Sequence, residues 1–244
     1  MRTIILVFVY IIVIVLSFCL LMPIGLIIRL FSKKASAAYA LFIVKCAFNL
    51  CMFISGCKKE VVGLEKVPTD TAVMYAANHR GFYDIILLYS IVPTQTAFVA
   101  KSGLRKFFCI AQWMWFLDCM FIERDNIKQS LDVILKAISL VKSGTSVYIS
   151  PEGTRNPTDE LLEFKEGSMK IATKGKVPIV PVCFTGTEKI MEESLPWVHS
   201  GKIRVEFGDP IYPDKLEKEE LKHIGRYTRD VIQKLYDSTL DSED

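Results

Sequence analysis

The stretch VMYAANHRGFYD, at residues 73–84, decides how this chain folds. Its apolar first half, residues 73–77, is typical of a buried strand, and His79 follows that strand almost directly. In α/β sheets, the loops that follow the strands carry functional side chains. The stretch therefore predicts a strand that ends at a functional site.

Apolar runs of this kind alternate with amphipathic helical patterns through the rest of the chain after Lys59. This alternation predicts one α/β domain with a mostly parallel or mixed sheet. The expected strands are residues 73–77, 97–100, 120–122, 146–149, 179–184 and 203–207. The clearest helix follows Asn126, a good N-cap, and ends at Gly144. Its apolar stripe is expected to pack in the core and contains Ile127, Leu131, Ile134, Ile138 and Val141.

The front of the chain predicts a membrane anchor. Hydrophobic residues make up 51% of the sequence, and the excess lies before Lys58. Residues 3–28 carry no charge, and a helix over them would be roughly 39 Å long, more than the ~30 Å hydrocarbon core of a bilayer. The run is also longer than the apolar part of a signal peptide. We expect residues 1–57 to form two apolar helices and residues 58–244 to form the α/β domain.

The placement of these helices in the membrane is left open by the sequence. Pro23 and Gly25 are expected to interrupt the first helix, and Lys45 and Asn49 give the second helix a polar stripe. The second helix is therefore a tilted span or an interfacial helix. The flanking basic residues favour a hairpin dipped into the inner leaflet of the cell membrane, with residues 58–244 on its cytoplasmic face. They are Arg29, Lys33, Lys34, Lys58 and Lys59.

Composition and missing motifs exclude several classes of protein. Thirty basic and 27 acidic residues leave a net charge of +3, which gives no support for a nucleic-acid partner. The seven cysteines form no C-x-x-C pair, so we expect neither a disulfide framework nor a metal site. The sequence also contains no G-x-S-x-G elbow, no P-loop and no G-x-G-x-x-G motif.

His79 and Asp84 form the first candidate site. On a continuous helix they would point about 140° apart, so a turn must bring them together, and Gly81 can supply it. Asp84 would then fix the tautomer of His79 and leave its other ring nitrogen as a base. In a second interpretation, Asp84 is only the N-cap of the helix that follows. The two roles are compatible.

The sequence EGTR at residues 152–155 forms the second candidate site, after the expected strand 146–149. An arginine side chain suits a bidentate contact with phosphate, although a plain polar turn would have the same composition. Further on, Lys165 and Gly167 lie at the start of another expected helix, where backbone N–H groups suit an anion.

Together these motifs resemble the 1-acyl-glycerol-3-phosphate acyltransferase family, whose four ordered blocks match between residues 75 and 186. The N-H-x-x-x-x-D block is Asn78, His79 and Asp84, and the resemblance implies that His79 is the general base and Asp84 the carboxylate that orients it. Gly81 stands where many members have Ser. Residues 177–182 are similar to the fourth block.

The second and third blocks supply the residues that the resemblance assigns to substrate binding. Residues 121–124 look like the family's F-I-x-R and residues 164–167 like its F-K-x-G. Around the places where many members have a Pro and several Gly residues in the second block, this chain has Phe107, Phe108, Leu117, Asp118 and Cys119. The expected substrate-binding residues are Arg124, Glu152, Gly153, Thr154, Arg155, Lys101 and Lys165.

The resemblance implies that the chain transfers a fatty acyl group from acyl carrier protein or coenzyme A to the sn-2 hydroxyl of lysophosphatidic acid in a membrane. It implies no metal and no cofactor besides the acyl thioester. Three alternatives remain open. They are an acyltransferase of this fold with another lysolipid or glycerol 3-phosphate as acceptor, a thioester hydrolase, and a membrane protein that binds anionic lipid without catalysis.

Overall fold

The central strands form from short runs of apolar residues that are buried on both faces, as is typical of parallel sheets. The structure is a computed structural model that describes residues 2–123, 125–156 and 158–241. Its strands are β1 (Lys58–Val62), β2 (Met74–Ala77), β3 (Thr96–Lys101), β4 (Met120–Ile122), β5 (Ser146–Ile149), β6 (Ile179–Thr185) and β7 (Lys202–Phe207). They form one sheet in the order β1-β7-β6-β2-β5-β3-β4, in which only the β6–β7 pair is antiparallel. The predicted α/β fold with a mixed, mostly parallel sheet is confirmed.

Each of the six expected strands is present, and the sequence analysis missed only β1 among the strands described. Its residues Lys58, Lys59 and Glu60 are charged, which hides a strand from any apolar pattern. The strand lies at one edge of the sheet and pairs with β7. There the guanidinium of Arg204 donates to Glu60 at 2.7 Å, so the charges of this edge are paired across the two strands.

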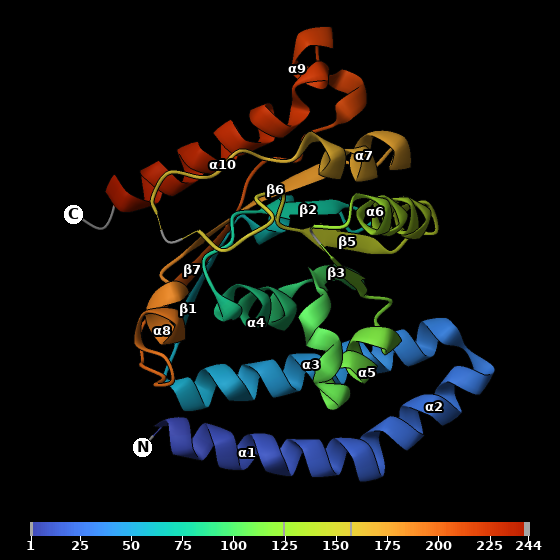
Figure 1. Cartoon of the computed structure of the whole chain (residues 1–244), viewed down its shortest axis with the longest axis vertical. Coiled ribbons are helices and arrows are strands. Elements are labelled where there is room, and N and C mark those ends of the chain that lie inside the picture. Colours follow the sequence, from blue (N-terminus) through green and yellow to red (C-terminus); the bar gives the residue numbers. More distant parts are fainter. Residues whose placement is uncertain (1, 124, 157, 242–244) are drawn as a thin grey trace.

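Helices cover both faces of the sheet (Figure 1). They are α4 (Phe82–Ile91), α5 (Phe108–Phe116), α6 (Ile127–Lys142), α7 (Glu166–Gly175), α8 (Glu188–Met191), α9 (Lys218–Lys222) and α10 (Ile224–Asp241). Side-chain alternation along β2 divides the core in two. Tyr75 and Ala77 pack in the cluster that contains α4 residues, whereas Met74 and Ala76 pack with residues of α6, α7 and α10.

The start of α6 corrects one expectation. Asn126 is its N-cap, as predicted, and its side chain accepts a hydrogen bond from the Gln129 amide. However, Ile127 and Leu131 are 87% and 51% exposed and do not pack in the core. The first turns of α6 lie beside β4, which is a three-residue edge strand and is too short to cover them. The buried face of α6 is formed further along by Val133, Ile134, Ala137 and Val141.

The first apolar run forms one bent helix. The helix α1 (Arg2–Leu16) continues through a π-helical turn, Ser17–Leu21, into α2 (Met22–Phe31). The expected interruption at Pro23 and Gly25 is therefore wrong. Pro23 lies in the first turn of α2, and the wider turn before it accommodates its missing N–H. At Gly25, a Cβ would lie 3.2 Å from the Phe116 ring, so glycine allows close packing.

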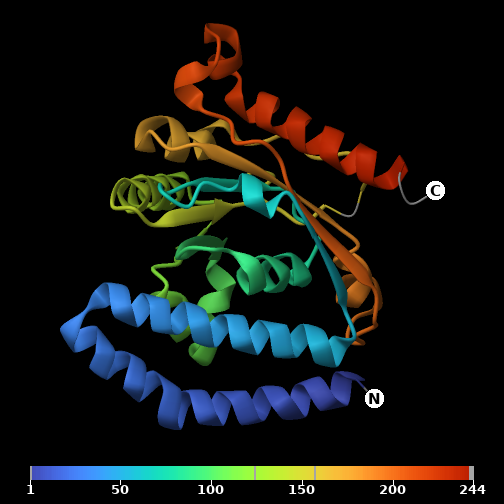
Figure 2. The same ribbon diagram turned by 180° about the vertical axis from the view of Figure 1, so that it is seen from behind.

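The chain reverses at Ser32 into α3 (Lys33–Ser55), which lies antiparallel to α1 (Figures 1 and 2). By length and composition, the helices Arg2–Phe31 and Lys33–Ser55 are long and apolar enough to cross a membrane. One face of α3 packs against the sheet domain, where Ala40, Leu41 and Val44 join the buried cluster of α4. The helix α1 lies on the far side of α3 from the sheet (Figure 1).

Candidate active site

The turn that carries His79 begins where β2 ends, and Asn78 fixes its position. The side-chain amide of Asn78 donates to the Phe184 carbonyl at 2.9 Å, and its oxygen accepts from the Phe184 amide at 2.8 Å. These two bonds attach the turn to β6. Because Asn78 is buried, the bonds are not exchanged for water, and the turn starts from a fixed point.

His79 and Asp84 are in direct contact. Nδ1 of His79 lies 2.8 Å from Oδ2 of Asp84, which is fully buried. The same oxygen accepts from the amides of Arg80 and Gly81 at 2.8 and 2.9 Å, and the other oxygen accepts from the Thr187 hydroxyl. A carboxylate in such a set of donors acts as an acceptor only. Nδ1 therefore carries the proton in the neutral ring, and Nε2 has a lone pair available as a base.

Asp84 also caps α4, although not at the expected position. The N-cap is Gly81, and Asp84 is the third residue of the helix, where its carboxylate reaches back to the amide of Gly81. Gly81 has a φ of −167°, an extended conformation that any residue adopts. The turn was expected to need the backbone freedom of glycine, and this expectation is wrong. The presence of glycine at this position therefore has another cause.

Glu152 holds the backbone of His79. Its Oε1 accepts from the His79 amide at 2.9 Å and its Oε2 accepts from the Leu162 amide at 3.1 Å. The carbonyl of His79 accepts from the Asn156 amide at 2.8 Å. Burial raises the pKa of Glu152, and the bonds from these amides oppose that shift. Both oxygens of Glu152 thus accept from backbone amides, so the residue holds the backbone of His79, whereas the resemblance implied a substrate contact.

Arg155 lies over the first residue of α4. Its guanidinium carbon is 4.6 Å from the centroid of the Phe82 ring, and its Nη1 is 3.8 Å from Oε1 of Glu192. About half of the side chain, 47%, is exposed. The arginine is therefore held on the surface beside the turn that carries His79, with its guanidinium accessible to an anion.

The residues around Arg155 form one loop with it. Gly153 has a positive φ of 74°, and a Cβ there would lie 3.0 Å from Nζ of Lys165. The positive φ favours glycine there, and the exposed Lys165 side chain passes close to it. Thr154 and Lys165 are exposed. The structure therefore brings Gly153, Thr154, Arg155 and Lys165 together.

Of the remaining two expected substrate-binding residues, the structure places only Lys101, which lies further away. Lys101 is exposed at the end of β3, and β5 separates β3 from β2. Two strand spacings amount to roughly 10 Å, so Lys101 lies at the border of the site. Arg124 lies outside the residues that the structure describes.

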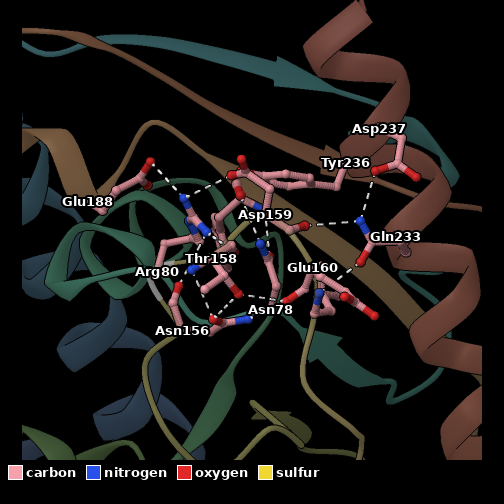
Figure 3. Close-up of polar contacts among 12 residues, drawn as sticks. Asn78, Arg80, Asn156, Thr158, Asp159, Glu160, Glu188, Gln233, Tyr236 and Asp237 are labelled. Carbon is pink, nitrogen blue, oxygen red and sulfur yellow. Dashed lines mark hydrogen bonds and ion pairs between the residues drawn. The ribbon is translucent and has the colours of Figure 1, made fainter.

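Arg80 was missed by the sequence analysis and connects three segments (Figure 3). Its side chain is almost completely buried. One guanidinium nitrogen donates to the carbonyls of Asn156 and Thr158, and the other donates to Glu188 at 3.1 Å. The carbonyls belong to the segment that follows Arg155. Arg80 therefore joins the His79 turn to the Arg155 loop.

Helix α10 supports the same loop from outside (Figure 3). The hydroxyl of Tyr236 donates to Asp159 at 2.7 Å, and Gln233 donates to the Asp159 carbonyl at 3.1 Å. The ring of Tyr236 lies 5.5 Å from the guanidinium carbon of Arg80. The C-terminal helix is thus part of the support of the site.

The segment after β6 supplies three further residues that the sequence analysis missed. Thr187 binds Asp84, Glu188 binds Arg80, and Glu192 accepts from the Phe82 amide. Their partners lie 103, 108 and 110 positions earlier in the chain. Because spacing in sequence says nothing about such distant pairs, these residues carried no local signal.

The described part of the chain contains no group of three His, Cys, Asp or Glu side chains that could hold a metal ion. All seven cysteines are free thiols. Cys119 and Cys183 are buried, and burial raises the pKa of the Cys119 thiol to about 11. Both thiols are therefore protonated at neutral pH and are poor nucleophiles.

Known proteins resemble this chain in sequence and in fold. A family model described as Acyltransferase matches residues 58–185. A chloroplastic 1-acyl-sn-glycerol-3-phosphate acyltransferase of Brassica napus is 35% identical over 66% of this chain and 47% of its own length. The Escherichia coli protein of that name is 29% identical over 68% of this chain and 69% of its own.

The solved structure of PlsC, the 1-acyl-sn-glycerophosphate acyltransferase of Thermotoga maritima, has the same fold. Its TM-score is 0.84 at 24% identity, and the match covers 98% of this chain and 94% of that one. The chain matches about half the length of the first plant relatives. Since the family model covers more than half of the 244 residues, the chain belongs to the acyltransferase family that its four sequence blocks resemble.

Proposed function

We propose that this protein transfers a fatty acyl group from an acyl thioester to the sn-2 hydroxyl of 1-acyl-glycerol-3-phosphate and so makes phosphatidic acid. The single observation that carries the proposal is the 2.8 Å contact between His79 and Asp84 at the end of β2. The loop that bears Arg155 lies beside this pair and offers a cation to the acceptor phosphate. The names of the relatives support the same acceptor.

In the proposed reaction, Nε2 of His79 takes the proton of the acceptor hydroxyl as its oxygen attacks the thioester carbonyl carbon. The carbonyl becomes a tetrahedral oxyanion. When the carbonyl re-forms, the carbon–sulfur bond breaks, and the departing thiolate takes the proton from His79. A base placed in this way contributes ~100- to 10,000-fold to the rate. The acyl donor is a thioester of acyl carrier protein or coenzyme A. The proposed reaction uses no metal and no further cofactor.

Arg155 is the proposed ligand of the acceptor phosphate, with Thr154 and Lys165 beside it and with Lys101 at the border of the site. Arg124, which lies outside the described residues, is proposed as a further ligand from the sequence motif alone. We expect Arg155→Ala to raise the KM for lysophosphatidic acid about tenfold or more. The matched control is Arg226→Ala, an exposed arginine at the start of α10. Phe82→Ala is unsuitable as a control because its ring packs against Arg155. An unchanged KM for Arg155→Ala would refute the phosphate assignment.

We also propose that residues 1–57 anchor the protein in the cell membrane and that residues 58–244 form the catalytic domain on its cytoplasmic face. Leu30 and Phe31, at the bend between α2 and α3, are 84% and 87% exposed, and Phe53 is 82% exposed. Contact of this apolar surface with water is unfavourable, whereas contact with lipid is not. Because one face of α3 packs on the domain, a hairpin dipped into one leaflet fits the packing better than two free spans.

Competition among acceptors tests the function. Membranes that contain the full chain are supplied with labelled acyl-CoA or acyl carrier protein thioester and with lysophosphatidic acid, other lysophospholipids or glycerol 3-phosphate. We expect phosphatidic acid as the main product and no free fatty acid when the acceptor is omitted. A preference for another acceptor would identify that acceptor as the substrate in place of lysophosphatidic acid. Acyl release without acceptor would indicate a hydrolase, and lipid binding without any product would indicate a binding protein.

A further inference from the structure

Glu192 fills the space that a side chain at residue 81 would occupy. A Cβ on Gly81 would lie 2.5 Å from Oε2 and 2.9 Å from Oε1 of Glu192. The extended backbone of Gly81 does not require glycine. The carboxylate beside it explains the glycine, so Gly81 and Glu192 are a matched pair.

The same carboxylate is the counter-charge of Arg155. Its Oε1 accepts from the Phe82 amide and lies 3.8 Å from Nη1 of Arg155, whose guanidinium covers the Phe82 ring. The Glu192 side chain is only 12% exposed, whereas Arg155 is 47% exposed. A ligand therefore has access to the guanidinium but not to the carboxylate.

The charge of Glu192 is poorly compensated. Its Oε2 is buried and has no hydrogen-bond partner among the described residues. Burial raises the pKa of Glu192, the charge of Asp84 adds to that shift, and the Phe82 amide and Arg155 oppose it. Asp84 on α4 and Arg155 in the loop after β5 are the charged side chains that act on it. With little water around it, the carboxylate acts strongly on any anion bound to Arg155.

We propose that Glu192 is a specificity-determining residue that lowers the affinity of Arg155 for the acceptor phosphate. The effect is larger for a doubly charged phosphate monoester than for a singly charged phosphodiester, because the repulsion grows with the charge of the ligand. This inference rests on the proposed function, in which Arg155 binds that phosphate.

The variant Glu192→Gln tests this proposal in membranes that contain the full chain. Glutamine keeps an oxygen for the Phe82 amide and removes the charge. We expect the KM for lysophosphatidic acid to fall about three- to tenfold, as for a partly screened charge pair, with kcat nearly unchanged. The KM for lysophosphatidylglycerol, a phosphodiester, falls by a smaller factor. The matched control is Glu193→Gln, which removes the same charge from the next, exposed residue and leaves both constants unchanged.

Substitution of Gly81 tests the matched pair. We expect Gly81→Ser to lower the melting temperature of the parent, because the serine Cβ would displace the Glu192 carboxylate. In a Glu192→Ala background the same change costs much less, since the space is vacant. Equal losses in the two backgrounds would show that Glu192 does not occupy this space.

The outcomes separate this inference from the proposed function. No product from the parent, or an unchanged KM in Arg155→Ala, defeats the proposed function or its phosphate site. If the parent is active and Arg155→Ala raises the KM, the proposed function holds, and the Glu192 variants then test the Glu192 inference by itself. It is then overturned by an unchanged or higher KM in Glu192→Gln, or by an equal fall in Glu193→Gln.

Discussion

Thr187, the second residue after β6, donates its hydroxyl hydrogen to Oδ1 of Asp84, whose other oxygen contacts His79. His79 and Asp84 follow β2, whereas Thr187 follows β6, and both Thr187 and Asp84 are fully buried. The proposed base is thus oriented by a carboxylate that is itself oriented by a second strand end.

The first prediction concerns this hydroxyl. Thr187→Val keeps the shape of the side chain and removes one donor from a buried carboxylate, which costs about 1–3 kcal/mol. We expect kcat to fall about tenfold while the KM for the acceptor stays within twofold. Steady-state kinetics measure both, with Thr69→Val, at an exposed position before β2, as the control. A changed KM with an unchanged kcat would contradict the positioning role.

Asp84→Asn tests the tautomer of His79. The amide can donate a hydrogen to Nδ1, which would shift the ring proton to Nε2 and remove the base. We expect kcat to fall by roughly 1,000-fold or more, as in catalytic triads with this change. The control is Asp70→Asn, an exposed residue that precedes β2, whereas His79 follows that strand. Activity near the parent level would mean that the His79–Asp84 contact only caps α4.

Arg80→Met removes the charge that pairs with buried Glu188. We expect the free energy of unfolding to fall by about 3 kcal/mol, because an unpaired buried carboxylate remains. Adding Glu188→Gln should recover part of this loss, since the two residues are coupled. Thermal or denaturant unfolding in detergent measures the difference, and Arg226→Met serves as the control. Additive effects of the two substitutions would show that the pair is not coupled.

The raised pKa of Glu192 predicts a pH-dependent stability. The folded protein binds the proton of Glu192 more tightly than the unfolded chain does, so the free energy of unfolding falls as pH rises from about 4.3 through the higher folded pKa. Glu192→Gln removes this contribution. We expect the variant to gain stability over the parent as pH rises, and Glu193→Gln to follow the parent. Parallel curves for Glu192→Gln and the parent would contradict a raised pKa.

Much of the fold was predictable because its signals are local. The strand before His79, the N-cap Asn126 and the apolar front helices each depend on neighbours in sequence. The exceptions have physical causes. The strand β1 is charged because it lies at an edge, and Ile127 and Leu131 on α6 are exposed because β4 is too short to cover them.

The site was predictable only in part for the same reason. The His79–Asp84 pair lies within one turn, so spacing and motif identified it. Glu188 and Glu192 meet their partners 108 and 110 positions away, and only the tertiary structure brings them together. Glu152 belonged to a recognised motif, yet its carboxylate binds backbone amides, which sequence cannot distinguish from a substrate contact.

The most direct test of the account is acyl transfer to lysophosphatidic acid by His79→Ala. The control is His199→Ala, which changes an exposed histidine. We expect the control to make phosphatidic acid at the parent rate and His79→Ala to lose about 100-fold or more of kcat, with unfolding transitions alike for all three proteins. Product formed by His79→Ala at the parent rate would contradict the central claim that His79 is the base.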